Sequence, residues 1–127
     1  MRRRLALLPA VLYALTIATL SHIPGLRPPP GASWADKAVH VVLYTGFGLT
    51  LALALTAQLP HRPFGKVALW TFVLGALYAA SDEVHQLFVP YRVADFLDWV
   101  ADVVGIGISV VLARRLSRRW NRWIHTG

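Results

Sequence analysis

Apolar residues occur in four long blocks, and the charged residues fall mainly between these blocks. Each block is near the length of about 20 residues that an α-helix needs to span the hydrocarbon core of a bilayer. Pro24-Gly25 and Pro60 follow the first and second blocks, at positions where a helix is expected to end. We therefore predict an all-α, polytopic transmembrane four-helix bundle in a single domain, residues 1–127, with helices over residues 5–23, 38–59, 65–88 and 96–113.

The composition agrees with this prediction, because 56% of the 127 residues are hydrophobic and only 15% are charged. A soluble domain of this size exposes much of its surface and needs more charge to cover it. The net charge of +7 does not indicate a nucleic-acid partner, since the basic residues gather beside the apolar blocks. Basic residues at such positions normally fix membrane topology. The absence of cysteine excludes disulfides and thiolate metal sites.

The basic residues are distributed unevenly between the two sides of the predicted bundle. If the N-terminus is cytoplasmic, 10 of the 13 Lys and Arg residues lie on the cytoplasmic side. The positive-inside rule therefore predicts a multi-pass protein of the cell membrane with both termini in the cytoplasm. Residues 5–23 lack a convincing small-x-small cleavage site, so we expect a retained helix and not a signal peptide. All 6 acidic residues then lie on the outer side or in the outer halves of helices.

The C-terminal tail, residues 114–127, is predicted to be a short amphipathic helix on the cytoplasmic surface of the membrane. One face carries Leu116, Trp120, Trp123 and Ile124, and arginines occupy much of the remaining circumference. Such a helix lies in the membrane interface and anchors the chain. Within the bundle, small residues let helices approach closely, and the glycines predicted to mark such contacts are Gly46, Gly48, Gly105 and Gly107.

Polar side chains form stripes at helical spacing on three of the predicted helices. The stripes consist of Lys37, His40 and Tyr44; of Tyr78, Asp82, His85 and Gln86, with Glu83 beside Asp82; and of Asp95, Asp98, Asp102 and Gly105. An ionisable side chain at the bilayer centre costs about 2.5–3.5 kcal/mol, so such groups usually face the bundle or a wet cavity. Hydrogen bonds that only hold the helices together are the alternative.

We predict that the stripes converge on one outward-facing pocket, together with the loop residue Arg92. The candidate ligand-binding residues are Lys37, His40, Tyr44, Asp82, Glu83, His85, Gln86, Arg92, Asp95, Asp98 and Asp102. In such a pocket Arg and Lys bind phosphate, and carboxylates accept hydrogen bonds from sugar or peptide groups. A second hypothesis is a hydrolase or transferase, with Glu83, His85 and Asp98 as the candidate catalytic residues.

The same residues leave open whether a divalent metal binds, with His40, Asp82, His85 and Asp98 as the candidate ligands. Their spacing is not that of a zincin, because His85 has no partner histidine four residues later. A third hypothesis is a proton-coupled carrier, which with four helices would have to act as a homo-oligomer. The sequence does not decide among the three functions.

The polar motifs resemble those of the VanZ-like membrane family. The matching pieces are Lys37-Ala-Val-His40-Val-Val-Leu-Tyr44, Ser81-Asp82-Glu83-Val84-His85-Gln86 with the following Arg92, and Asp95-Phe-Leu-Asp98-Trp-Val-Ala-Asp102-Val-Val-Gly105. The resemblance covers roughly residues 21–113, and Asp102 stands where Asn is common in the family. It implies a small membrane protein of the cell envelope whose relatives are linked to resistance to the glycopeptide teicoplanin. The expected partners are membrane lipids, a lipid-linked cell-wall precursor or a glycopeptide.

Overall fold

The structure, a computed structural model, describes residues 2–26 and 33–125, and within these ranges every regular element is a helix. The helices are α1 (Arg2–Leu5), α2 (Leu8–His22), α3 (Ser33–Gln58), α4 (Phe64–Gln86) and α5 (Phe96–His125). Four segments of the described chain are long and apolar enough to cross a membrane: Arg3–His22, Trp34–Gln58, Phe64–Gln86 and Phe96–Ser117. The prediction of an all-α bundle with four membrane-spanning helices is confirmed.

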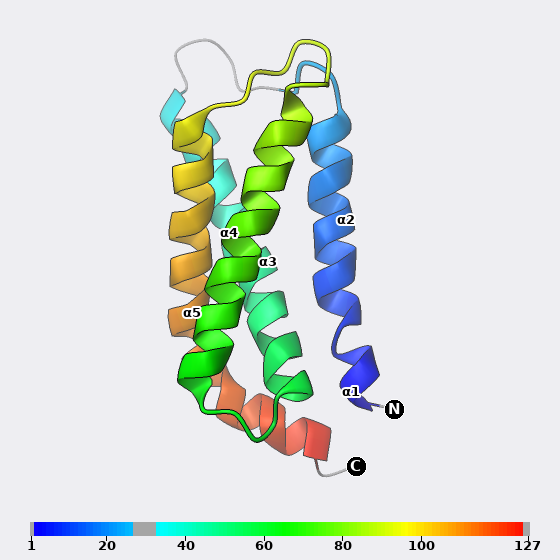
Figure 1. Cartoon of the computed structure of the whole chain (residues 1–127), viewed down its shortest axis with the longest axis vertical. Coiled ribbons are helices and arrows are strands. Elements are labelled where there is room, and N and C mark those ends of the chain that lie inside the picture. The colour runs from blue at the N-terminus through cyan, green and yellow to red at the C-terminus, as the bar shows by residue number, and fades with distance from the viewer. Residues whose placement is uncertain (1, 27–32, 126–127) are drawn as a thin grey trace.

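The four long helices run side by side along the long axis of the molecule, and both termini lie at the same end (Figure 1). We call this end the basic end, because it holds the N-terminal arginines, the α3–α4 connection and the arginines of the tail. We call the opposite end the polar end. There α2 and α4 finish and α3 and α5 begin, so the polar stripes of three helices lie at one level.

Several helix bounds differ from those predicted. The first helix is interrupted at Ala6-Leu7, between α1 and α2, and α3 begins at Ser33 instead of near residue 38. The early start places Asp36 in the first turn of α3, where its negative charge is favourable beside the helix dipole. The last helix continues to His125, because no glycine or proline occurs between residues 108 and 125 to end it.

The tail therefore forms the last turns of α5, which run across the basic end of the bundle (Figure 1). Trp120 packs against Ala6 and Ala57, and its indole Nε1 donates a hydrogen bond to the carbonyl of Leu53 at 2.8 Å. Part of the apolar face predicted for membrane anchoring thus contacts the protein itself. The side chains of Trp123 and Ile124, which complete that face, lie outside the described residues.

Among the described helices, α3 and α5 form the most extensive contact, and small residues lie in it. A Cβ atom on Gly105 would lie 2.6 Å from the backbone oxygen of Val41, and one on Gly48 would overlap Ser109. Gly46 is similarly covered by Tyr13 of α2. The prediction for Gly107 was wrong, since a Cβ atom there would meet nothing within 4 Å.

The outer surface of the bundle is apolar. Leu12, Leu15 and Leu77 are each about 60% exposed, whereas buried positions include the polar residues Asp82, Glu83, Asp98 and Asp102. This distribution is the reverse of that in a soluble protein, where ionisable residues are almost never fully buried unless they are paired. It fits a bundle that faces lipid on its outside and collects its polar groups inside.

Candidate functional site at the polar end

An ion-pair network joins the start of α3 to the start of α5. The Lys37 Nζ donates to Asp95 Oδ2 at 2.7 Å and to Asp98 Oδ1, and it lies 3.9 Å from Asp36 Oδ2. The hydrogen bond from Lys37 holds the pKa of the Asp95 carboxyl below its usual range. Asp95 also accepts the backbone N–H of Leu97 at 2.8 Å, so it caps the N-terminus of α5.

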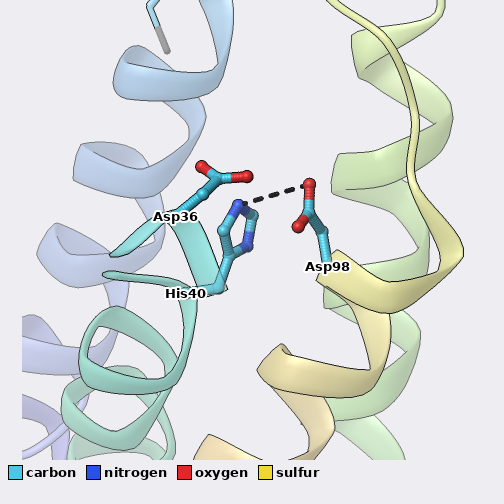
Figure 2. A group of neighbouring side chains, drawn as sticks. All are labelled: Asp36, His40 and Asp98. Atoms are coloured by element: carbon cyan, nitrogen blue, oxygen red, sulfur yellow. Dashed lines mark ion pairs between the residues drawn. The ribbon is translucent and has the colours of Figure 1, made fainter. Parts of the chain in front are cut away.

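His40 lies one turn deeper and contacts α5 through both sides of its ring. Its Nδ1 lies 2.7 Å from Asp102 Oδ1, and its Nε2 lies 3.7 Å from Asp98 Oδ2. An ionised Asp102 carboxylate can only accept a hydrogen bond, and in that state Nδ1 of His40 carries the proton toward it. Figure 2 shows the ring of His40 between the carboxylates of Asp36, from the same helix, and Asp98.

The α4 helix contributes two adjacent buried carboxylates, whose surroundings differ. Asp82 Oδ2 accepts a hydrogen bond from the Tyr44 hydroxyl at 3.2 Å. Glu83 Oε2 accepts the backbone N–H of Asp95 at 3.0 Å, whereas Glu83 Oε1 is buried without a hydrogen-bond partner among the described residues. Asp102 Oδ2 is likewise buried without a hydrogen-bond partner among the described residues. The polar end therefore holds buried acceptor atoms that the described chain does not satisfy.

Arg92 reaches the site from the α4–α5 connection. The preceding residue, Tyr91, has a φ of 60°, in the left-handed region that is uncommon for a residue other than glycine. Arg92 Nη1 donates to the backbone carbonyl of Leu26, after the end of α2. Its Nε is buried and has no hydrogen-bond partner in the described part of the chain.

A cavity of about 430 Å³ opens between α2, α3 and α4 at this level. Its polar lining residues are Ser21, Asp36, His40, Tyr44, Asp82, Gln86 and Arg92, and its apolar lining includes Ile17, Leu20, Val39 and Leu43. A second hollow of about 380 Å³ lies between α4 and α5, is mostly apolar and includes Glu83 and Asp95 in its wall. Asp82 and His40 thus line the first hollow, and Glu83 lines the second.

Among the described residues, two sets of side chains within this site could hold a metal ion. They are Asp36, His40 and Asp98, and His40, Glu83 and Asp102; in each set one donor atom per residue lies within 4.8 Å of the others. Nitrogen from histidine with carboxylate oxygen suits Zn²⁺ and other divalent transition metals. The donor types are therefore appropriate for a divalent cation in either set.

Comparison with known proteins assigns the chain to a family. The model of the VanZ/LLP1 family matches residues 4–118, which is most of the chain and includes the whole polar end. The chain belongs to the VanZ/LLP1 family. No curated protein and no solved structure gives a match.

In this VanZ/LLP1 protein, most of the predicted site residues lie at the polar end. The contacts described above join five of them, namely Lys37, His40, Asp95, Asp98 and Asp102. Hydrogen bonds also join Tyr44 to Asp82 and Glu83 to the backbone of Asp95. Gln86 and Arg92 line the larger cavity. The helices that carry these residues are far apart in sequence but adjacent in space.

His85 is placed differently from the prediction. Its side chain is exposed, and its Nε2 lies 3.3 Å from Nδ1 of His22, which is at the end of α2. The two rings stack with centroids 5.5 Å apart. The rotation of α4 brings Asp82 and Gln86 to the cavity, and His85 therefore points toward the outer edge of α2 instead of toward His40.

Two features of the site were missed from the sequence. Asp36 lines the cavity and lies four residues before His40, so its helical spacing could have identified it. The carbonyl of Leu26 that accepts from Arg92 belongs to the backbone and has no signal in the residue types.

Proposed function

We propose that the cavity at the polar end binds the headgroup of an envelope amphiphile: an envelope lipid, a lipid-linked cell-wall precursor or a glycopeptide. The observation that carries the proposal is the division of the cavity lining into polar and apolar parts. A ligand with a charged or hydroxylated head and an apolar tail would match both parts. Pockets of this size, apolar with a few converging polar groups, are typical of small-molecule sites.

The polar lining provides both donors and acceptors. The guanidinium of Arg92 retains an unused buried N–H at Nε, and arginine binds phosphate or carboxylate with several donors in a fixed geometry. Asp36 and Asp82 accept hydrogen bonds from hydroxyl or ammonium groups. The complementary headgroup therefore carries an anionic group toward Arg92 and hydrogen-bond donors toward the carboxylates.

The apolar lining supports an amphiphile over a free polar solute. Ile17 and Leu20 of α2 and Leu43 of α3 form one wall, and α2 packs less extensively on the rest of the bundle than α3 packs on α5. An acyl tail lying along α2 would be as apolar as this wall and would pack against it through van der Waals contacts. A water-soluble sugar or nucleotide would leave this wall without a partner.

The test is retention of co-purified amphiphiles by the Arg92→Gln variant. We expect loss of a charge-assisted hydrogen bond worth about 1.5–3 kcal/mol, which corresponds to a roughly tenfold to hundredfold weaker binding. Native mass spectrometry of the protein in mild detergent, followed by competition with phosphatidylglycerol vesicles, measures the retained ligand. The matched control is Arg62→Gln, which removes the same charge at the basic end.

Equal retention by Arg92→Gln and Arg62→Gln would contradict the proposal. Loss in both variants would show that net charge alone attracts the lipid, since a surface attraction does not depend on one position.

A second function, hydrolysis or group transfer on a lipid-linked substrate, is favoured by one contact. Asp102 accepts from His40 Nδ1 at 2.7 Å, and His40 lines the cavity. A carboxylate that holds a histidine in one tautomer leaves the other ring nitrogen to act as a general base. Incubation with phosphatidylglycerol and measurement of the released headgroup tests this function. His40→Gln should abolish release if the reaction occurs, while His85→Gln should not.

A further inference from the structure

Three buried carboxylates at the polar end have no Lys or Arg ion-pair partner in the described part of the chain. They are Asp82, Glu83 and Asp102, with exposed fractions of 7%, 7% and 0%. Asp82 accepts from Tyr44, but Glu83 and Asp102 each keep one buried oxygen without a hydrogen bond among the described residues. A buried carboxylate is stable only when a cation, a proton or hydrogen-bond donors compensate its charge.

The two residues that carry these unsatisfied oxygens, Glu83 and Asp102, belong with His40 to one of the two candidate ligand sets found among the described residues. One ring nitrogen of His40 and one oxygen from each carboxylate lie within 4.8 Å of one another. Because Nδ1 is the ring nitrogen that faces Asp102, a bound ion would replace the proton between these two groups, which is released. Ligands about 2.1 Å from one metal ion lie roughly 3–4 Å apart, so these side chains need only a small inward movement. The three residues come from α3, α4 and α5, so an ion here would join three helices.

The other set is occupied by a cation of the protein. Lys37 donates to Asp98 and lies 3.9 Å from Asp36, so a dication between these carboxylates would be repelled by the ammonium group. No lysine or arginine in the described chain lies within ion-pair distance of Glu83 or Asp102. The set with free acceptor atoms is therefore the better metal site.

We propose that His40, Glu83 and Asp102 form a binding site for one divalent transition-metal ion of the Zn²⁺ class. Three protein ligands of the types nitrogen, oxygen and oxygen leave a coordination position open, as in metal sites that also bind a ligand. The large cavity reaches His40 and the smaller hollow reaches Glu83, so the ion lies between two approaches from the polar end. The site stands on these contacts alone and does not depend on the proposed headgroup binding.

The exposed pair His22 and His85 is a competing zinc site and has to be removed first, because two histidine nitrogens lie 3.3 Å apart there. The parent for the experiment is therefore the full chain with His22→Ala and His85→Ala, purified without a histidine tag and stripped with a chelator. Equilibrium dialysis against Zn²⁺ alone, with metal analysis, measures ions bound per chain. We expect one ion per chain.

Glu83→Gln and Asp102→Asn should each weaken zinc binding at least about tenfold, since even an outer partner of a metal ligand is worth that factor. Asp36→Asn is the matched control, because it neutralises a carboxylate of the other set and should keep the affinity of the parent. Melting temperatures without metal separate folding from binding. Each amide keeps one oxygen that can accept the hydrogen bond made by the carboxylate, from His40 or from the Asp95 N–H, so the melting temperatures should stay near that of the parent.

Three results would overturn the proposal: no zinc retained by the parent, equal affinity in all three variants, or loss in Asp36→Asn with retention in Glu83→Gln. Zinc X-ray absorption on the loaded parent needs none of the three carboxylate variants and remains informative if one of them fails to fold. It should show a single imidazole with oxygen ligands, and two imidazoles would contradict the assignment. Protons or water would then satisfy Glu83 and Asp102.

Discussion

Asp95 makes two separate contacts at the start of α5. One oxygen accepts the backbone N–H of Leu97 at 2.8 Å, and the other accepts from Lys37 at 2.7 Å. The first contact satisfies a free N–H at the helix N-terminus, and the side-chain oxygen of an asparagine at position 95 could accept the same hydrogen bond. The second contact needs a negative charge, so a substitution by asparagine separates the two effects.

The lowered pKa of Asp95 predicts an acid-dependent loss of stability. A carboxyl with a lower pKa in the folded than in the unfolded state stabilises the fold above its unfolded pKa, near 4. This contribution is lost as the pH falls through the folded pKa. Melting temperatures measured from about pH 6 down to pH 2.5 should therefore fall more steeply in the parent than in Asp95→Asn.

Asp95→Ala is the comparison for the cap, because it removes both contacts and should lower the melting temperature at neutral pH below that of Asp95→Asn. Parallel acid profiles for the parent and Asp95→Asn would show that the ion pair with Lys37 adds nothing to stability.

At the scale of the helices, the pairing of α3 with α5 sets the position of the site. Lys37 and His40 of α3 face Asp98 and Asp102 of α5, and deeper in the bundle Gly105 lies against the α3 backbone near Val41. The close contact at glycine fixes the distance between the two helices. A change in this distance would act directly on the ion pairs, because Val41 is next to His40 and Gly105 lies within about two turns of Asp98 and Asp102.

Gly105→Ala should therefore destabilise the bundle. The new Cβ atom would lie 2.6 Å from Val41 O and 2.9 Å from Thr45 N, which are backbone atoms that cannot rotate away. We expect a loss of about 1–3 kcal/mol in the free energy of unfolding, typical of overpacking. The melting temperature of the protein in detergent measures the effect.

Gly107→Ala, two residues later on the same helix, is the matched control. Its Cβ atom would meet nothing within 4 Å, and alanine is a better helix former than glycine by about 0.8–1.0 kcal/mol. This variant should melt at or above the temperature of the parent. If Gly107→Ala lowered the melting temperature as much as Gly105→Ala, close packing would not explain the need for glycine at these positions.

At the scale of the whole molecule, the helices and the shared level of the polar stripes could be predicted from the sequence. Long apolar blocks have few alternative structures, and buried charge has to face the bundle. The rotation of each helix could not be predicted, because Asp82, His85 and Gln86 all fall on one broad face of α4. Only the position of α2 decides that Gln86 lines the cavity while His85 meets His22.

The orientation of the molecule in the membrane stays a prediction, and it concerns the whole chain. An even number of membrane spans places both termini on the same side of the membrane. Figure 1 agrees, because both ends of the chain lie at the same end of the bundle. The basic end carries 10 of the 13 Lys and Arg residues of the sequence. The positive-inside rule then predicts that the basic end is cytoplasmic and that the cavity opens to the outside.

Single cysteines test this orientation directly, since the chain has none of its own. Val93→Cys lies in the exposed α4–α5 connection at the polar end, and His61→Cys lies in the exposed α3–α4 connection at the basic end. A membrane-impermeant maleimide added to spheroplasts should label Val93→Cys at once and His61→Cys only after lysis. The opposite pattern would place the polar cavity in the cytoplasm, where a ligand from the outer leaflet could not reach it.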